Sequence, residues 1–275
     1  MNHAKIIIFI LNCLIPIYSL AENEIIQEEK DIFEKITAEN LILAETNSER
    51  ILYQRNVDKK IYPASLTKLM TAILVLENCE LDEIVTVSEK AVFSIPSGYV
   101  NANLQVGEEL TVEDLLYVML IPSANDAANA LAEHVGGNIE SFSTMMNTRA
   151  KELGCTGTNF TNPSGLHEKE HYTTTRDLYL ISKEAITKPI IKKIIKTTKY
   201  TLPETNKYTD IKSRRYFIST NYMIRDNLDK YYCDYCIGGK TGYTKEAKNC
   251  VIEYAEKDGV ELVAIVMGET ASVKG

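Results

Sequence analysis

The chain of 275 residues has no tryptophan, no basic run interleaved with aromatic residues and a formal net charge of -8. Nucleic acid is therefore not expected as a partner. No internal repeat and no low-complexity linker divides the sequence. With 45% hydrophobic and 25% charged residues, the composition is that of an ordinary globular protein and excludes a disordered one.

Long apolar runs are also missing, except for one at the N-terminus. Lys5 gives a short positive region, residues 6–17 are mostly apolar, and Ser19-Leu20-Ala21 puts small residues at a cleavage position. The run is short for a membrane span. We predict a secretory signal peptide over residues 1–21, with an uncleaved anchor as the alternative, and a lead-in segment over residues 22–39. An extracytoplasmic location is expected, secreted or in the cell envelope.

Cysteine is scarce, and its pattern does not complete a zinc site. Six cysteines become five once Cys13 leaves with the signal peptide, so at least one thiol has no partner within the chain. Cys233 and Cys236 form a C-x-x-C without a second pair or a nearby histidine. The motif runs into glycines and not into a helix, which favours a local disulfide or plain packing over a thioredoxin-like role. No metal and no cofactor is predicted. Three histidines are expected to make local hydrogen bonds or to lie at the surface: His134, His167 and His171.

The order of elements along the chain is strands, then helices, then strands. Two short apolar runs around a turn predict a hairpin over residues 41–44 and 51–54. Apolar residues at steps of three and four predict helices over about 65–78, 115–120, 126–135, 139–153, 174–187 and 189–196. Further strands are predicted at 85–87, 197–202, 215–219, 249–254 and 260–267, with a loop-rich connection at 93–109. This order predicts one α/β domain of the α+β type, whose N- and C-terminal strands share a sheet flanked by helices.

The first chemically suggestive motif lies at the start of the first predicted helix. Ser65 and Lys68 stand three residues apart, so both side chains project from one face. A serine hydroxyl is a weak nucleophile until a base removes its proton, and lysine is such a base when its neutral form is favoured. The helix N-terminus adds backbone N–H groups where an oxyanion would form. On its own, this spacing is common on solvated helices.

Two more short motifs follow in order. Ser123-Ala124-Asn125 lies between two predicted helices, and Lys240-Thr241-Gly242 lies on a glycine-flanked strand. Taken singly, Ser123 or Asn125 could cap a helix, and Lys240 could be a solvated strand residue. Together the three motifs correspond to the S-x-x-K, S-D-N and K-T-G set of class A β-lactamases and penicillin-binding proteins.

The wider sequence resembles the low-molecular-mass penicillin-binding proteins, specifically secreted D-alanyl-D-alanine carboxypeptidases, over about residues 40–270. The segments that carry the resemblance are Pro63–Thr71, Ser123–Ala128, Asn162–Leu166, His171–Thr174 and Gly239–Thr244. The resemblance implies a β-lactamase/transpeptidase-like fold: an antiparallel sheet, flanking helices and a mostly helical middle subdomain. Residues 40–275 would form this penicillin-binding catalytic domain. Relatives commonly continue into a further helix, a small β domain and a membrane-binding helix, so peripheral membrane association is expected only with such an extension.

The resemblance also implies catalytic roles. Ser65 would attack the carbonyl between the two terminal D-alanines of a peptidoglycan stem peptide, and Lys68 would take its proton. Ser123 would relay a proton to the leaving amine. Water would then hydrolyse the acyl-enzyme, and β-lactam antibiotics would be covalent inhibitors because their adducts clear slowly.

Five residues are expected to bind the substrate. Asn125 would hold both the substrate amide and the Lys68 side chain. Lys240 would set the local electrostatic field, and Thr241 would bind the terminal carboxylate. The backbone N–H of Tyr243 would complete an oxyanion hole with that of Ser65. Gly242 would leave the strand edge open to an extended peptide.

Three alternatives remain at this point. A D,D-endopeptidase uses the same machinery. A β-lactamase needs a carboxylate that activates the deacylating water, usually in a Glu-x-x-Leu-Asn context, and this sequence has no such segment. A non-catalytic penicillin-sensing domain is normally attached to a transmembrane signalling segment, which this sequence lacks.

Overall fold

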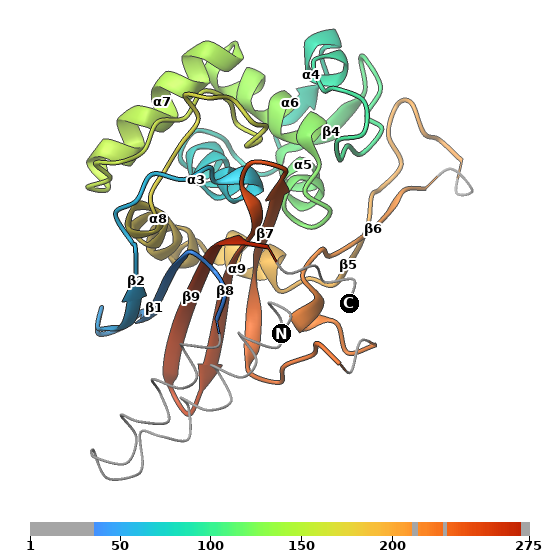
Figure 1. Ribbon diagram of the computed structural model, residues 1–275. Helices are drawn as coiled ribbons and strands as arrows, with labels where there is room; N and C mark the ends of the chain where they lie inside the picture. Colours follow the sequence, from blue (N-terminus) through green and yellow to red (C-terminus); the bar gives the residue numbers. More distant parts are fainter. Residues whose placement is uncertain (1–35, 211–213, 228–229, 271–275) are drawn as a thin grey trace, which may run out of the picture.

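A five-stranded antiparallel sheet in the order β2-β1-β9-β8-β7 forms one layer of the fold (Figure 1). The computed structural model describes residues 36–210, 214–227 and 230–270, so the predicted signal peptide and residues 22–35 of the lead-in lie outside the described residues. The sheet consists of β1 (Asn40–Glu45), β2 (Ile51–Arg55), β7 (Cys236–Thr244), β8 (Lys248–Lys257) and β9 (Val260–Glu269). N- and C-terminal strands therefore share one sheet, as predicted.

The central strands are buried on both faces. On β1, Ile42 and Ala44 face one hydrophobic cluster while Leu41 and Leu43 face another, because successive side chains point to opposite faces of a sheet. Burial on both faces explains why β9 is a nearly continuous apolar run. A tight turn with Asp258 and Gly259 in the left-handed region joins β8 to β9.

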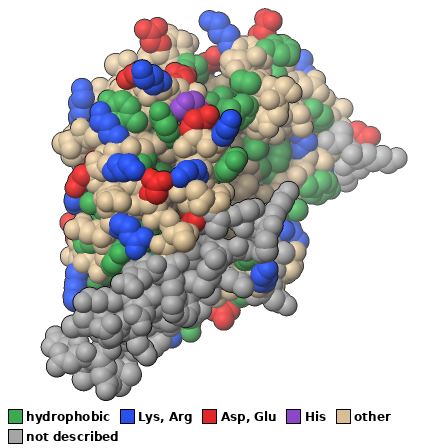
Figure 2. All heavy atoms as spheres, in the orientation of Figure 1, with side chains coloured by type: hydrophobic (Ala, Val, Ile, Leu, Met, Phe, Trp, Pro, Cys, Tyr) green, Lys and Arg blue, Asp and Glu red, His purple; other side chains and the backbone are tan. Residues whose placement is uncertain are grey.

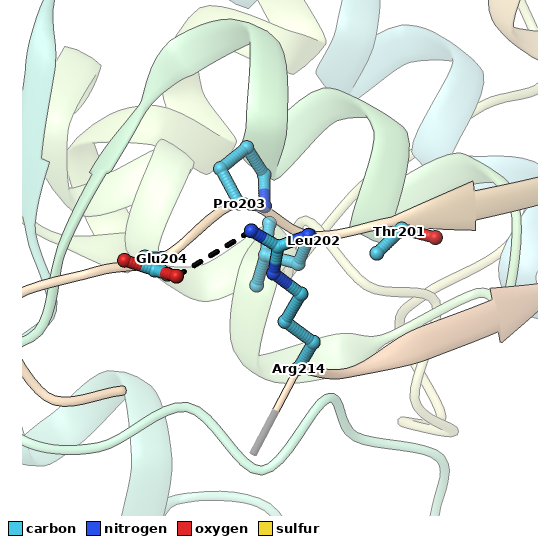
Figure 3. Close-up of a pocket in the computed structure, with 5 residues that line it drawn as sticks. All are labelled: Thr201, Leu202, Pro203, Glu204 and Arg214. Atoms are coloured by element: carbon cyan, nitrogen blue, oxygen red, sulfur yellow. Dashed lines mark hydrogen bonds and ion pairs between the residues drawn. The ribbon is translucent and has the colours of Figure 1, made fainter. Parts of the chain in front are cut away.

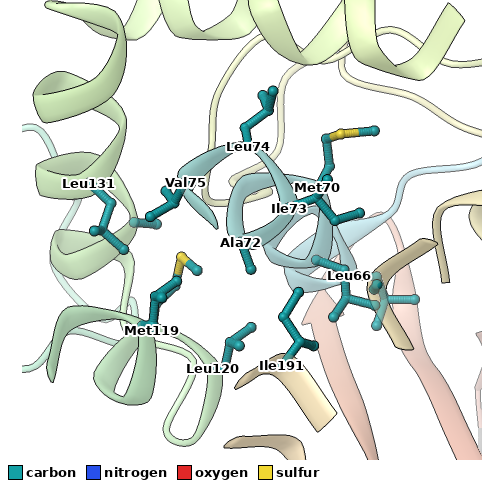
Figure 4. Packing of buried hydrophobic residues seen from close by; sticks show 14 of the residues in the cluster. Leu66, Met70, Ala72, Ile73, Leu74, Val75, Met119, Leu120, Leu131 and Ile191 are labelled. Carbon is teal, nitrogen blue, oxygen red and sulfur yellow. The ribbon is translucent and has the colours of Figure 1, made fainter. Parts of the chain in front are cut away.

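Helices cover one face of this sheet (Figure 1). They are the 3-10 turn η2 (Ala64–Thr67), α3 (Lys68–Asn78), α4 (Glu89–Phe93), α5 (Val112–Leu120), α6 (Asn125–Gly136), α7 (Ile139–Glu152), α8 (Thr175–Thr187), α9 (Pro189–Ile195) and the 3-10 turn η4 (Tyr222–Ile224). Helix α3 lies at the centre, where Met119 of α5, Leu131 of α6 and Ile191 of α9 surround it (Figure 4). Because α3 is held on several sides, its N-terminal turn is a rigid base for side chains.

Threonine side chains cap the starts of α5 and α8. The Thr111 hydroxyl accepts a hydrogen bond from Asp114 N at 3.0 Å, and the Thr174 hydroxyl accepts one from Asp177 N at 3.1 Å. Helix α6 ends at Gly137, whose φ of 75° is the left-handed geometry that glycine adopts without strain. The caps explain why sequence and structure agree on the starts of α5 and α8 to within a few residues.

The predicted strands at 85–87, 197–202 and 215–219 are confirmed, but they pair outside the main sheet. The pair β5 (Lys199–Thr201) and β6 (Tyr216–Ile218) forms its own two-stranded sheet, as does the pair β3 (Ile84–Thr86) and β4 (Glu109–Thr111). The loop predicted over 93–109 ends in β4 and begins at the end of α4, and neither element was predicted. Elements of three to five residues are too short to show a periodic pattern.

The surface shows no continuous basic area in Figure 2, where Lys and Arg side chains alternate with Asp and Glu on the visible described part. Within residues 36–210, 214–227 and 230–270, no helix has both the length and the hydropathy that a bilayer crossing requires.

Candidate active site

Ser65 lies in the tight turn η2, directly before α3. The preceding Ala64 has a φ of 48°, a left-handed conformation that is uncommon for a residue with a Cβ. A Cβ at Gly165 would lie 1.9 Å from the Ala64 carbonyl oxygen, so only glycine fits against this turn. Ala64 is thus held in a costly geometry at the point where Ser65 is presented, which is typical of functional sites.

Lys68 is completely buried, and its amine contacts the Ser65 hydroxyl. Its Nζ donates to Ser65 Oγ at 3.0 Å, to Asn125 Oδ1 at 2.8 Å and to the Ser164 carbonyl oxygen at 2.6 Å. Burial lowers the pKa of Lys68 well below its usual value, and the positive charge of Lys240 lowers that pKa further, while Asp126 opposes the shift. A buried amine in reach of a hydroxyl is suited to act as a general base.

The second motif sits where α6 begins. Ala124 is the N-cap residue of α6, and no side chain caps this end, so neither Ser123 nor Asn125 is used as a cap. Ser123 has a φ of 71°, a second left-handed residue with a side chain in the site. Instead of capping α6, the Ser123 hydroxyl accepts a hydrogen bond from Lys240, and the side-chain oxygen Oδ1 of Asn125 accepts one from Lys68.

The third motif lies on β7, at the edge of the main sheet. Lys240 is buried, and its Nζ donates to Ser123 Oγ at 2.8 Å and to the Thr241 carbonyl oxygen at 2.7 Å. Burial lowers the pKa of Lys240 to about 7. Lys240 is therefore not the solvated strand residue that its sequence alone allowed.

The rest of the motif brings the backbone of β7 next to Ser65. A Cβ on Gly242 would lie 3.0 Å from Ser65 N, so the two segments are in close contact at this glycine. The Thr241 hydroxyl is 2.6 Å from the hydroxyl of Thr220. Tyr243 is 65% exposed.

Two groups that support the site were not singled out from the sequence. The hydrogen bond from Lys68 Nζ to the Ser164 carbonyl oxygen is the shortest of the three that Lys68 makes. Asp126 is buried, and its carboxylate accepts from the backbone N–H groups of Ala102, Leu104 and Ala127. Burial raises the pKa of Asp126 against the effect of these bonds. Both residues stood inside segments that carried the family resemblance, which was the available signal.

The histidines make local contacts. His171 is buried between the hydroxyl of Thr67, at 2.8 Å, and the backbone N–H of Thr161, at 3.0 Å. Burial lowers the pKa of His171 to about 3, so it is neutral near pH 7. His134 lies 3.1 Å from a Glu83 oxygen, and His167 meets Tyr62 edge to face. The expectation of local hydrogen bonds is confirmed for His134 and His171, whereas Nδ1 of His167 is buried without a hydrogen-bond partner.

Other candidate sites lie away from these motifs. Cys79, Glu83 and His134 offer ligand atoms within 4.8 Å of one another, at the far ends of α3 and α6 from Ser65. A pocket of about 540 Å³ is lined by Thr201, Leu202, Pro203, Glu204 and Arg214 (Figure 3). Neither place contains any of the eight residues predicted from the sequence.

The fold and the three motifs define a class, that of the DD-peptidases. The crystal structure of a Streptomyces DD-transpeptidase matches with a TM-score of 0.77 and 31% identity, over 86% of this chain and 92% of that chain. Residues 25–271 match the D-alanyl-D-alanine carboxypeptidase family, and the chain belongs to this family. The predicted fold class and family resemblance are therefore confirmed.

Curated relatives agree with this assignment. The D-alanyl-D-alanine carboxypeptidase DacF of Bacillus subtilis is 36% identical over 84% of this chain and 57% of its own length. The D-alanyl-D-alanine endopeptidase of Escherichia coli is 28% identical over 85% of this chain and 72% of its own. This chain thus spans little more than half the length of the Bacillus relative.

Proposed function

We propose that the protein is a serine D,D-carboxypeptidase that removes the terminal D-alanine from peptidoglycan stem pentapeptides. The observation that carries the proposal is the contact of 3.0 Å between the fully buried amine of Lys68 and the Ser65 hydroxyl. The predicted signal peptide supports action outside the cytoplasm, where peptidoglycan is found. Family membership supports the substrate class and covalent inhibition by β-lactams.

Acylation begins when neutral Lys68 accepts the Ser65 proton and Oγ attacks the carbonyl between the two D-alanines. The oxyanion is stabilised by the backbone N–H groups of Ser65 and Tyr243, which the close approach of Gly242 to Ser65 supports. Such donors act strongly because they are fixed before the reaction and need no reorganisation.

Departure of the D-alanine needs a proton on its amine. Ser123 supplies it, because its hydroxyl is in contact with Lys240 and the two can exchange a proton at 2.8 Å. Lys240 and Thr241 attract the terminal carboxylate, and Asn125 orients the substrate amide while fixing Lys68. The proton that Lys68 took from Ser65 passes on through Ser123 to the amine, which leaves Lys68 neutral. Water then enters and hydrolyses the acyl-enzyme, with Lys68 accepting the proton of the water and returning a proton to Ser65.

The test measures D-alanine release from a pentapeptide ending in D-Ala-D-Ala, and covalent labelling by a fluorescent penicillin. Ser65→Ala and Lys68→Ala are expected to abolish both signals without unfolding the protein. Matched controls are Ser141→Ala and Lys151→Ala, which change exposed residues of α7.

Each alternative gives a different result in the same assay. Cleavage of cross-linked dimers without release from the pentapeptide indicates an endopeptidase. Rapid penicillin hydrolysis indicates a β-lactamase, and stable labelling without turnover indicates a sensor. Normal penicillin labelling of Lys68→Ala would refute the assignment of the base.

A further inference from the structure

A second group of reactive side chains lies in the turn before β7, apart from the Ser65 site. Cys233 and Cys236 are both free thiols, and Cys233 is 4% exposed. The turn is closed by a hydrogen bond of 3.1 Å from Cys236 N to the Cys233 carbonyl oxygen. Cys233 N donates to the Met223 carbonyl at 3.0 Å, which fixes the turn against η4. Both cysteines pack in the same hydrophobic cluster as Val251 and Ala255 of β8, so their side chains lie on one face of the sheet.

A buried carboxyl group stands beside this pair. Glu253 of β8 is completely buried, and no ion pair to it is found among the described residues. Asn221 Nδ2 donates to Oε2 at 2.7 Å, whereas Oε1 is buried without a well-formed hydrogen bond. Burial raises the pKa of Glu253 to about 8, so the carboxyl exchanges its proton near neutral pH. Isolating a carboxyl group in this way costs stability and calls for a functional explanation.

The two thiols differ in the way that a nucleophilic and a resolving cysteine differ. The neighbouring Cys236 thiol lowers the pKa of Cys233 to about 7, against the effect of burial. The interaction with Cys233, burial and the adjacent Glu253 raise the pKa of Cys236 well above its usual value. Cys233 is therefore the thiol that forms a thiolate, while Cys236 needs a base to become reactive.

We propose that Cys233 and Cys236 form a redox-active dithiol/disulfide site in which Glu253 accepts the proton of Cys236. The oxidant is a small disulfide of the glutathione class. The Cys233 thiolate attacks one of its sulfurs, which forms a mixed disulfide and releases one thiolate. Glu253 then takes the Cys236 proton, and the Cys236 sulfur attacks Cys233 and releases the second thiolate. Two electrons pass from the cysteines to the oxidant, and both oxidant sulfurs leave reduced.

The site is connected to the strand that carries the K-T-G motif. Glu253 pairs with Gly239 in the register of β7 and β8, and a Cβ on Gly239 would lie 2.6 Å from Glu253 Oε2. The same oxygen accepts from Asn221, whose neighbour Thr220 contacts Thr241. A disulfide would fix the start of β7 through these contacts. The inference does not depend on the proposed function, because it uses no residue of the Ser65 site.

The experiment treats the folded, full chain with glutathione disulfide and counts free thiols by alkylation and mass spectrometry. The wild-type protein is expected to lose two hydrogens in a Cys233–Cys236 disulfide. Cys236→Ser is expected to stop at a glutathione adduct on Cys233, and Cys233→Ser is expected to react at neither position. Cys155→Ser is the matched control: it removes a buried thiol whose pKa is raised to about 12, and the disulfide is expected to form as in wild type.

The role of Glu253 is tested in the same reaction. Glu253→Gln keeps the shape of a neutral carboxyl group, so the fold is expected to persist, and ring closure from the mixed disulfide is expected to slow about 100-fold. Glu253→Asp, which keeps a carboxyl group, should close faster than Glu253→Gln. The control Glu256→Gln changes an exposed residue of the same strand.

Two results would overturn the proposal. One is a folded protein whose Cys233 and Cys236 stay reduced in excess glutathione disulfide. The other is a Cys236→Ser variant whose adduct forms on Cys79 and not on Cys233. Equal closure rates for wild type and a folded Glu253→Gln would remove Glu253 from the reaction.

Discussion

Replacing Gly242 by alanine tests whether the backbone of β7 takes part in the reaction of Ser65. The added methyl group would lie 3.0 Å from Ser65 N, 3.2 Å from the Ala64 Cβ and 3.4 Å from Leu66 N. These separations require the neighbours to move by a few tenths of an ångström, which β7 can do because it is an edge strand. The methyl group would, however, stand against the N–H of Ser65, where the oxyanion is expected.

Loss of one oxyanion donor costs about 2.7–4 kcal/mol in the transition state, which is about 100-fold to 1,000-fold in rate. We therefore expect Gly242→Ala to reduce the acylation rate by about this factor while unfolding at nearly the wild-type temperature. The assay is stopped-flow labelling with a fluorescent penicillin, combined with thermal unfolding.

Gly239→Ala, three residues earlier on the same strand, is the matched contrast. Its Cβ would lie 2.1 Å from the Ile252 carbonyl oxygen, a backbone atom that cannot give way. Overpacking of this kind costs about 1–3 kcal/mol, which lowers the unfolding temperature by about 2–12 °C in a domain of this size. Gly239→Ala should therefore mainly lower the unfolding temperature, whereas Gly242→Ala should mainly lower the acylation rate.

The reasoning is wrong if Gly242→Ala acylates within about threefold of wild type while folded. It is also wrong if its loss of acylation is matched by a loss of stability as large as that of Gly239→Ala, because the effect would then be structural.

The structure also predicts the direction of the effect of three other substitutions. Ser123→Ala removes the acceptor of Lys240 and should slow the acylation step about 100-fold or more at unchanged substrate binding, measured as kcat against KM. Asp126→Asn removes the negative charge that raises the pKa of Lys68, so the acid limb of the acylation profile should move to lower pH; a move to higher pH would contradict this. Glu253 has a pKa raised from 4.5 to about 8 on folding, so its contribution to stability is full below pH 4.5 and lost as pH rises through 8. Glu253→Gln should flatten urea-unfolding stability across that window, and an unchanged slope would disprove the assignment.

Local sequence signals were sufficient for much of the fold. The caps at Thr111 and Thr174 and the glycine at 137 define helix ends within a few neighbouring residues, so their outcome does not depend on the rest of the chain. The hairpin of β1 and β2 is a similar case. Elements as short as α4 and β4 escaped prediction because their stability comes from tertiary packing and not from a local pattern.

The candidate site, like the fold, was predicted only in part from the sequence. The residue types and their spacing established three motifs, a nucleophile with a lysine one helical turn away, and the family. They did not establish that the left-handed Ala64 and Ser123 exist, or that Ser164 supplies a carbonyl to Lys68. The left-handed Ala64, for example, packs against Gly165, about 100 residues further along the chain, and no local pattern predicts that contact.

The amino-acid sequence by itself determined the order of helices and strands, because periodicity and caps act over a few residues. Only the tertiary structure decided the chemistry available to Lys68 and Lys240. Burial in the folded protein lowers the pKa of both lysines, and repulsion from Lys240 lowers that of Lys68 further; both effects need groups that lie far apart in sequence. The same holds for Glu253, whose isolation next to Cys236 exists only once β7 and β8 have paired.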